Sequence, residues 1–112
     1  MRSDNSVGKS GDECAGILRA LGDATRLGVL QALLDRPQHV GELQAKLGVE
    51  QSLLSHHLKV LREAGLVLAT RDGKAVLYQV TPAIAGAKQD QCIDLQCCQV
   101  VFRPGQKSKK VQ

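Results

Sequence analysis

Four cysteines are the side chains of this sequence best suited to chemistry, and three of them fall within seven residues. Cys92, Cys97 and Cys98 lie near the C-terminus, and Cys14 lies near the N-terminus. Thiolates are soft ligands, so they suit Cu(I), Zn(II) and thiophilic heavy metals, and a set of three also suits trivalent arsenic. The C-x4-C-C spacing differs from the C-x2-C of common structural zinc sites. We therefore predict a soft-metal or metalloid site formed by these four cysteines.

Two other interpretations of the cysteines stay open. In a thiol redox or persulfide sensor, Cys92 or Cys14 would pair with Cys97 or Cys98, since adjacent cysteines seldom bridge each other. In a structural role, the thiols would be small buried hydrophobes beside the apolar run 100–102. A small thiol enzyme or metal carrier is a remote alternative, because no histidine lies near the cluster in sequence to activate a thiol. We predict no enzymatic activity.

A second group of polar side chains recurs at i, i+3, i+4 and i+7 along residues 50–64. The group is Ser52, Ser55, His56 and Lys59, with Gln51 at the leading end. The opposite face is apolar: Leu54, Leu58 and Leu61, widened by Leu53 and Val60. Short hydroxyls, an imidazole and a lysine suit base edges and phosphates, whereas an ordinary solvated face mixes Glu with Lys. The pattern therefore predicts a helix that reads DNA.

The elements that must position these residues follow from hydrophobic periodicity and from turn residues. Helices are predicted over 12–21, 24–34, 40–47 and 50–64, strands over 66–70 and 74–80, and a short helix over 83–89. Asp23 is a good N-cap, and Gly48 supplies the turn between the third and fourth helices. Residues 91–102 fit a helix and a strand equally well, so that choice stays open.

The connector Arg71-Asp72-Gly73-Lys74 contains Asp-Gly, a strong signal for a tight hairpin turn. Arg71 and Lys74 flank this turn and could reach a neighbouring minor groove. Two helices joined by a glycine-containing turn and followed by such a hairpin form a winged helix-turn-helix. The predicted fold class is therefore mainly α with a β-hairpin wing, and dimeric, with the first and last helices at the interface.

Length and charge bound the organisation of the chain. At 112 residues there is room for one domain, and the net charge of +4 equals that of the last ten residues, 103–112. The rest is neutral, so overall charge says little about DNA binding. We predict a flexible segment 1–11, a DNA-binding and dimerisation domain 12–90, a cysteine-rich sensing segment 91–102 and a disordered basic tail 103–112. Neither a signal peptide nor a membrane-spanning run is visible, which favours a cytoplasmic protein.

Three segments resemble the ArsR/SmtB repressors. Residues 20–27 (ALGDATRL) resemble the opening signature of that family, residues 55–67 (SHHLKVLREAGLV) its recognition helix, and residues 71–78 its hairpin. The resemblance covers residues 12–81. It implies a dimeric winged-helix repressor that binds operator DNA, an inverted repeat, and leaves it when a metal ion, metalloid or thiol-reactive species binds. No cofactor is expected for DNA binding itself, and As(III) or a soft metal ion would be the inducer.

The family senses its inducers at several different places, and two of these are missing here. The Cys-x-Cys pair at the start of the third helix is replaced by His39, Val40 and Gly41. The Asp and His set of a long last helix is not matched either, because no histidine follows His57. Sensing is therefore predicted to fall to the four cysteines, and His57, beside the packed face, is predicted to be structural.

Overall fold

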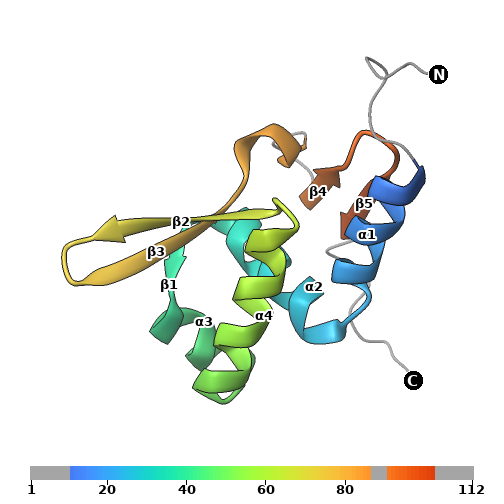
Figure 1. The fold of residues 1–112 in the computed structure, drawn as a ribbon. Helices are drawn as coiled ribbons and strands as arrows, with labels where there is room; N and C mark the ends of the chain where they lie inside the picture. The colour runs from blue at the N-terminus through green and yellow to red at the C-terminus, as the bar shows by residue number, and fades with distance from the viewer. Residues whose placement is uncertain (1–10, 87–90, 103–112) are drawn as a thin grey trace.

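The computed structural model describes residues 11–86 and 91–102, which form four helices, a three-stranded sheet and a separate hairpin (Figure 1). The elements are α1 (Gly11–Leu21), α2 (Ala24–Asp35), β1 (Gln38–His39), α3 (Val40–Leu47), α4 (Gln51–Glu63), β2 (Val67–Asp72), β3 (Ala75–Val80), a 3-10 turn η2 (Pro82–Ile84), β4 (Gln91–Asp94) and β5 (Gln99–Phe102). The predicted segment 1–11 and the predicted tail 103–112 lie outside the described residues, apart from Gly11, which begins α1.

The four predicted helices are confirmed to within one residue at each end. The side chain of Asp23 caps α2 by accepting a hydrogen bond of 3.0 Å from the backbone N–H of Arg26. Gly48 ends α3 with a left-handed φ of 66°, a conformation that glycine adopts without steric cost. Local capping and turn residues thus set the ends of the helices.

The sheet has the strand order β1-β3-β2, and all pairings are antiparallel. Strands β2 and β3 form the predicted hairpin, in which Asp72 pairs with Ala75 and Gly73, with a φ of 65°, lies in the two-residue turn. This hairpin projects from the body as a wing (Figure 1). Strand β1 was not predicted, because two residues are too few to show an alternating pattern.

The predicted helix over 83–89 is wrong at Ala85 and Gly86. Of the described residues in this stretch, only those of η2 are helical; Ala85 forms an antiparallel bridge with Ile93, and the N–H of Gly86 donates to the carbonyl of Cys92 at 2.9 Å. Residues 87–90 lie outside the described residues. Residues 91–102, for which helix and strand were both possible, form the β4–β5 hairpin, and Ile93 and Leu95 are fully buried. Pairing with Ala85 therefore overrides the helical pattern.

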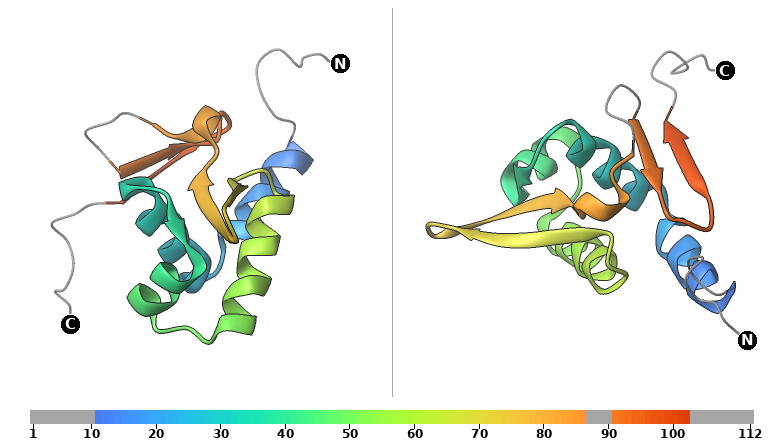
Figure 2. Two further views of the ribbon diagram at one scale, coloured as in Figure 1. Left: turned by 90° about the vertical axis from the view of Figure 1, so that its left-hand side faces the viewer. Right: turned by 90° about the horizontal axis from the view of Figure 1, so that it is seen from above.

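One leucine-rich core joins the helices, the wing base and β4. Its fully buried members include Leu30, Leu43, Leu54, Leu58, Leu61, Leu66, Ile93 and Leu95. Leu53, which was predicted on the apolar face of the fourth helix, is exposed at 48%, and Leu18 of α1 is exposed at 46%. Helix α1 lies at one side of the body (Figure 2, right), where Ile17, Ala20 and Leu21 are its buried residues.

No helix within residues 11–86 or 91–102 combines the length and the hydropathy that crossing a membrane requires.

Candidate nucleic-acid interface and sulfur site

Helix α4 presents its polar stripe on the outside of the molecule. Every member of the stripe is exposed, namely Gln51, Ser52, Ser55, His56 and Lys59. On the other side of the same helix, Leu54, Leu58 and Leu61 are buried in the core. Helix α3 precedes α4 across the short connection 48–50, so the pair has the geometry of a helix-turn-helix, and α4 is its second helix.

An acidic side chain that the sequence pattern did not reveal lies at the tip of this stripe. Glu50 is the N-cap of α4, and the hydroxyl of Ser52 donates to its two carboxylate oxygens at 2.7 and 2.8 Å. The pKa of Glu50 is held below its usual value, chiefly by the hydrogen bond from the Ser52 hydroxyl and next by that from the backbone N–H of Leu53. The proton of Ser52 is thus engaged, and its oxygen remains as an acceptor for a base edge.

The exposed Leu53 also borders the stripe on the first turns of α4. Sequence periodicity assigned it to the packed face, yet an apolar side chain at this place suits contact with a thymine methyl group. Lys59 lies 4.0 Å from Glu63, one turn further along. An exposed pair of this kind is weak, so the ammonium of Lys59 stays available for a phosphate.

The wing carries the two predicted basic residues at its tip. Arg71 and Lys74 are both exposed, on either side of Gly73. The wing is also tied to α3, because Nε2 of His39 lies 2.9 Å from Oδ2 of Asp72 and Nδ1 of His39 lies 3.4 Å from Glu42. His39 is the N-cap residue of α3. The pKa of Glu42 is held below its usual value, chiefly by the hydrogen bond from the backbone N–H of His39 and next by that from the Arg36 side chain.

His57 is buried beside the packed face of α4, where the sequence predicted it to lie. Its side chain is 9% exposed, and its Nδ1 lies 3.0 Å from Nη1 of Arg26. A guanidinium has only donors, so Nδ1 is the acceptor of this hydrogen bond. The other ring nitrogen, Nε2, lies 3.8 Å from Oδ2 of Asp23. The hydrogen bond from the backbone N–H of Arg26 is the main cause that holds the pKa of Asp23 below its usual value.

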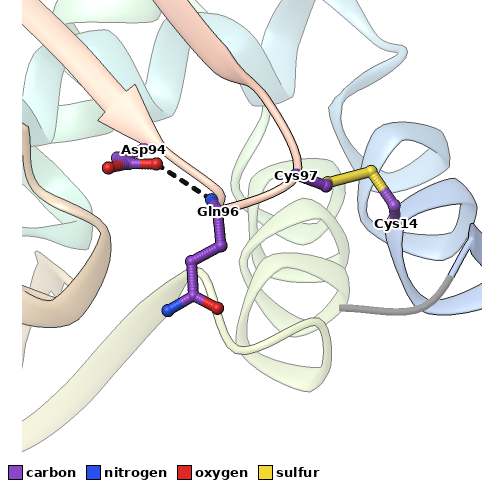
Figure 3. The surroundings of a disulfide bond; sticks show 4 residues. All are labelled: Cys14, Asp94, Gln96 and Cys97. Carbon is purple, nitrogen blue, oxygen red and sulfur yellow. Dashed lines mark hydrogen bonds between the residues drawn. A yellow bond between two sulfur atoms is a disulfide. The ribbon is translucent and has the colours of Figure 1, made fainter. Parts of the chain in front are cut away.

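Three of the four cysteines meet between α1 and the β4–β5 turn. Cys14 and Cys97 form a disulfide with a Cα–Cα distance of 6.3 Å (Figure 3). The sulfur atoms of Cys14, Cys97 and Cys98 all lie within 4.8 Å of one another. The turn itself is held by Asp94, which accepts from the N–H of Gln96 at 2.9 Å, and by Gln96 with a φ of 76°. Residues 83 positions apart in sequence thus form one group.

Cys92 is not part of this group. It is a buried free thiol on β4, packed so closely on Gly86 that a Cβ added there would lie 2.8 Å from its sulfur. Sulfurs bound to one ion at about 2.3 Å lie within about 4.6 Å of each other. In the reduced state, the donor set of Cys14, Cys97 and Cys98 fits a soft three-coordinate ion after a small adjustment, and Cys92 would need a rearrangement of β4.

Comparison with known proteins gives the same fold and one family. The family described as "Bacterial regulatory protein, arsR family" matches residues 23–68. The transcriptional regulator CmtR of Mycobacterium tuberculosis is 50% identical over 60 residues, which are 54% of this chain and 51% of that protein. The chain therefore spans about half the length of this curated relative.

Two further relatives match over longer stretches. The biofilm growth-associated repressor of Xylella fastidiosa is 34% identical over 91 residues, which cover 81% of this chain and 80% of that protein. The solution structure of a homodimeric winged helix-turn-helix DNA-binding domain from Mycobacterium bovis, described as a possible ArsR-family transcriptional regulator, has a TM-score of 0.60 at 28% identity and covers 66% of this chain and 74% of that one. The matched proteins are transcriptional regulators rather than enzymes.

Proposed function

The chain belongs to the ArsR family of bacterial regulatory proteins, and from this premise we propose that it is a dimeric repressor controlled by its three clustered cysteines. Helix α4 enters the major groove and the wing reaches the flanking minor groove. Base edges are read by Gln51, Ser52, Ser55 and His56, and phosphates are met by Lys59, Arg71 and Lys74. DNA binding needs no cofactor, and the protein acts in the cytoplasm, where the operator is.

The inducer is a thiophilic metal or metalloid ion of the arsenite or soft heavy-metal class. The observation that carries this proposal is the approach of three sulfur atoms, from Cys14, Cys97 and Cys98, to within 4.8 Å. Three thiolates in one place are the donor set that trivalent arsenic prefers. Cys92, the fourth predicted ligand, takes no part in this arrangement, because it is packed on Gly86.

A second candidate for the inducer is an oxidant, and the bond between Cys14 and Cys97 favours it. Formation of this disulfide from two thiols releases two protons and two electrons. A hydroperoxide accepts them, and its O–O bond breaks to give an alcohol and water, or two waters from hydrogen peroxide. Both candidates use α1 and the β4–β5 turn as the two parts that are joined, so both would change the same contact.

A single substitution separates the two inducers. Cys98→Ser removes the third soft ligand and leaves Cys14 and Cys97 able to bridge. If a metal ion is the inducer, arsenite and cadmium no longer release Cys98→Ser from operator DNA. If an oxidant is the inducer, hydrogen peroxide still releases it. Cys14→Ser and Cys97→Ser lose both responses, because each ion or disulfide needs both sulfurs.

The readout is operator affinity by fluorescence anisotropy, on a duplex selected from random sequence, with uptake of the ion followed by its thiolate absorption. Cys92→Ala is the matched control and should respond like the unaltered protein. Normal induction by arsenite, cadmium and peroxide in the double variant Cys97→Ser/Cys98→Ser would show that the cluster is not the sensor, and the structural interpretation of the thiols would then stand.

A further inference from the structure

Arg26 is the side chain that crosses the gap between the cysteine-bearing helix and the DNA-facing helix. It lies in the first turn of α2 and lines a groove of about 660 Å³ between α1 and the C-terminal half of α4. Ile17 and Ala20 line this groove from α1, and Val60 and Ala64 line it from the end of α4. Because this groove lies between the two helices, their side chains do not pack fully against each other there. The polar contacts of Arg26 therefore contribute more to holding the two helices together.

The guanidinium of Arg26 holds one atom of each helix. Its Nε donates to the backbone carbonyl of Ala20 at 2.5 Å, and its Nη1 donates to Nδ1 of His57 at 3.0 Å. The carbonyl of Ala20 lies in the last turn of α1, where helix carbonyls lack a partner within the helix. A guanidinium is planar and rigid, so the two acceptors are held at a fixed separation.

Each end of this bridge belongs to an element with a proposed task. On α1, Ala20 follows Cys14 in the same helix, about 9 Å along the axis. On α4, His57 follows His56 of the DNA-facing stripe, and the two rings lie 5.6 Å apart. A shift of α1 at the sulfur site therefore reaches the carbonyl of Ala20, the guanidinium, the buried imidazole and then the middle of α4.

We propose that Arg26 is the positioning residue that couples the sulfur site to the DNA-facing surface, an inference that rests on the function proposed above. Joining Cys14 to the β4–β5 turn moves the last turn of α1, and Arg26 passes this displacement to His57. Gly22, between α1 and α2, lets α1 change its angle without breaking a helix. Arg26 touches neither the ion nor DNA, so its effect is on the coupling between the two sites.

The test compares two operator affinities of the whole chain: that of the reduced, ion-free protein and that of the protein loaded with arsenite. Their ratio measures the coupling. The unaltered protein should lose affinity about 5- to 150-fold on loading. Arg26→Lys keeps the charge but lacks the fork that holds two acceptors, so its ratio should fall below about twofold. Arg19→Lys is the matched control, because Arg19 is an exposed arginine that lines the same groove. It should keep the full ratio.

His57 supplies a second pair of variants, which decide the question even if Arg26→Lys does not fold. His57→Asn keeps an acceptor near the place of Nδ1 and should retain coupling, whereas His57→Leu removes the acceptor and should lose it. A third measurement needs no variant: the ring nitrogen resonances of His57 should shift when arsenite binds to the DNA-free protein, and those of His39 should not.

The outcomes separate the coupling from the function on which it rests. If the protein binds no operator, or if it neither takes up an ion nor forms a disulfide, the proposed function fails. If it does all that is proposed and Arg26→Lys or His57→Leu keeps the full affinity ratio, the coupling role of Arg26 is wrong. Unchanged His57 resonances during a loss of operator affinity would overturn it as well.

Discussion

The polar side chains of α4 differ in how free they are to meet a base edge. Ser52 donates its proton to the carboxylate of Glu50, and Lys59 lies beside Glu63, whereas Ser55 and His56 are exposed near the middle of the stripe. Base edges in the major groove are read by donors and acceptors that are not already paired. Ser55 and His56 are therefore the residues on which sequence preference should depend most.

We predict that Ser55→Ala with His56→Ala abolishes specific operator binding and leaves the fold intact. Both side chains point outward, so the free energy of unfolding should change by no more than about 0.5 kcal/mol. Anisotropy titrations and thermal melting measure the two effects. Arg62→Ala, exposed at the other end of α4, should keep the sequence preference. Full repression by the double variant would mean that α4 does not read DNA.

Glu50 makes the N-terminus of α4 sensitive to acid. Its pKa in the folded protein lies below the ordinary value of 4.5, chiefly because of the Ser52 hydroxyl, so the folded state binds fewer protons than the unfolded state. The stabilisation is complete above pH 4.5 and is lost as the pH falls through the lowered pKa. Melting temperatures should therefore fall in acid, and Glu50→Gln should show a shallower fall. An equal slope in both proteins would contradict this.

At the scale of elements, the β4–β5 hairpin depends on a close approach of two backbone segments. A Cβ at Gly86 would lie 2.8 Å from the sulfur and 2.9 Å from the backbone oxygen of Cys92. The backbone oxygen cannot move aside as a flexible side chain would. The position of β4, and with it that of Cys97 and Cys98, therefore depends on the absence of a side chain at residue 86.

We predict that Gly86→Ala destabilises the protein by about 1–3 kcal/mol, the usual cost of overpacking. It should also weaken arsenite uptake, because the sulfur-bearing turn follows β4. Chemical denaturation and thiolate absorption measure the two effects. Gly41→Ala is the control: nothing lies within 4 Å of a Cβ there, so stability should be kept or slightly raised. If both variants have the same free energy of unfolding, the close approach at Gly86 does not contribute to stability.

The wing is an element whose contribution to DNA binding should be independent of sequence. Replacing Arg71 and Lys74 by Gln should weaken binding to all duplexes about equally and flatten the dependence of affinity on salt, since phosphate contacts release counterions. Titrations at several salt concentrations, on operator and on unrelated DNA, measure this. Arg19→Gln, far from the wing, should leave the salt slope unchanged. A loss confined to one base position would contradict the assignment.

At the scale of the molecule, the sequence predicted a dimer whose interface is formed by the first and last helices. The structure requires a different interface. Helix α1 is present, but the described part of the predicted last helix is helical only in the 3-10 turn η2, and the next described element is the β4–β5 hairpin. Exposed apolar side chains occur on both remaining elements, with Leu18 of α1 at 46% and Val101 of β5 at 53%. These two elements lie on the side of the body opposite the wing (Figure 2, right).

We predict a two-fold dimer that binds an inverted repeat, with α1 and β5 at the interface. The two α4 helices would then enter major grooves about 34–36 Å apart. Leu18→Glu should shift the protein toward monomer in sedimentation experiments and reduce it to half-site binding, while Leu68→Glu, exposed on β2, should remain dimeric. A monomer at micromolar concentration in the unaltered protein would rule the dimer out.

The helix-turn-helix and the wing could be predicted from the sequence because their signals are local. Each turn or cap signal acts on the backbone within a few residues, as at Asp23, at Gly48 and at the Asp72-Gly73 pair. The leucine spacing of α4 is likewise contained within one helix. The exposed polar stripe follows from the same period. Only its edges were misjudged: Glu50 turned out to cap the helix, and Leu53 lies beyond the surface that the body covers.

Tertiary structure alone decided which thiols meet. Cys92 lies five residues from Cys97 in sequence, yet strand pairing with Val101 and packing on Gly86 bury it away from the group. Cys14 joins Cys97 across 83 residues because α1 packs where the β4–β5 turn ends. The ambiguous period of residues 91–102 was settled by the bridge between Ala85 and Ile93. A contact between segments far apart in the sequence produces no periodic residue pattern in either segment. Such contacts therefore cannot be predicted from local sequence patterns.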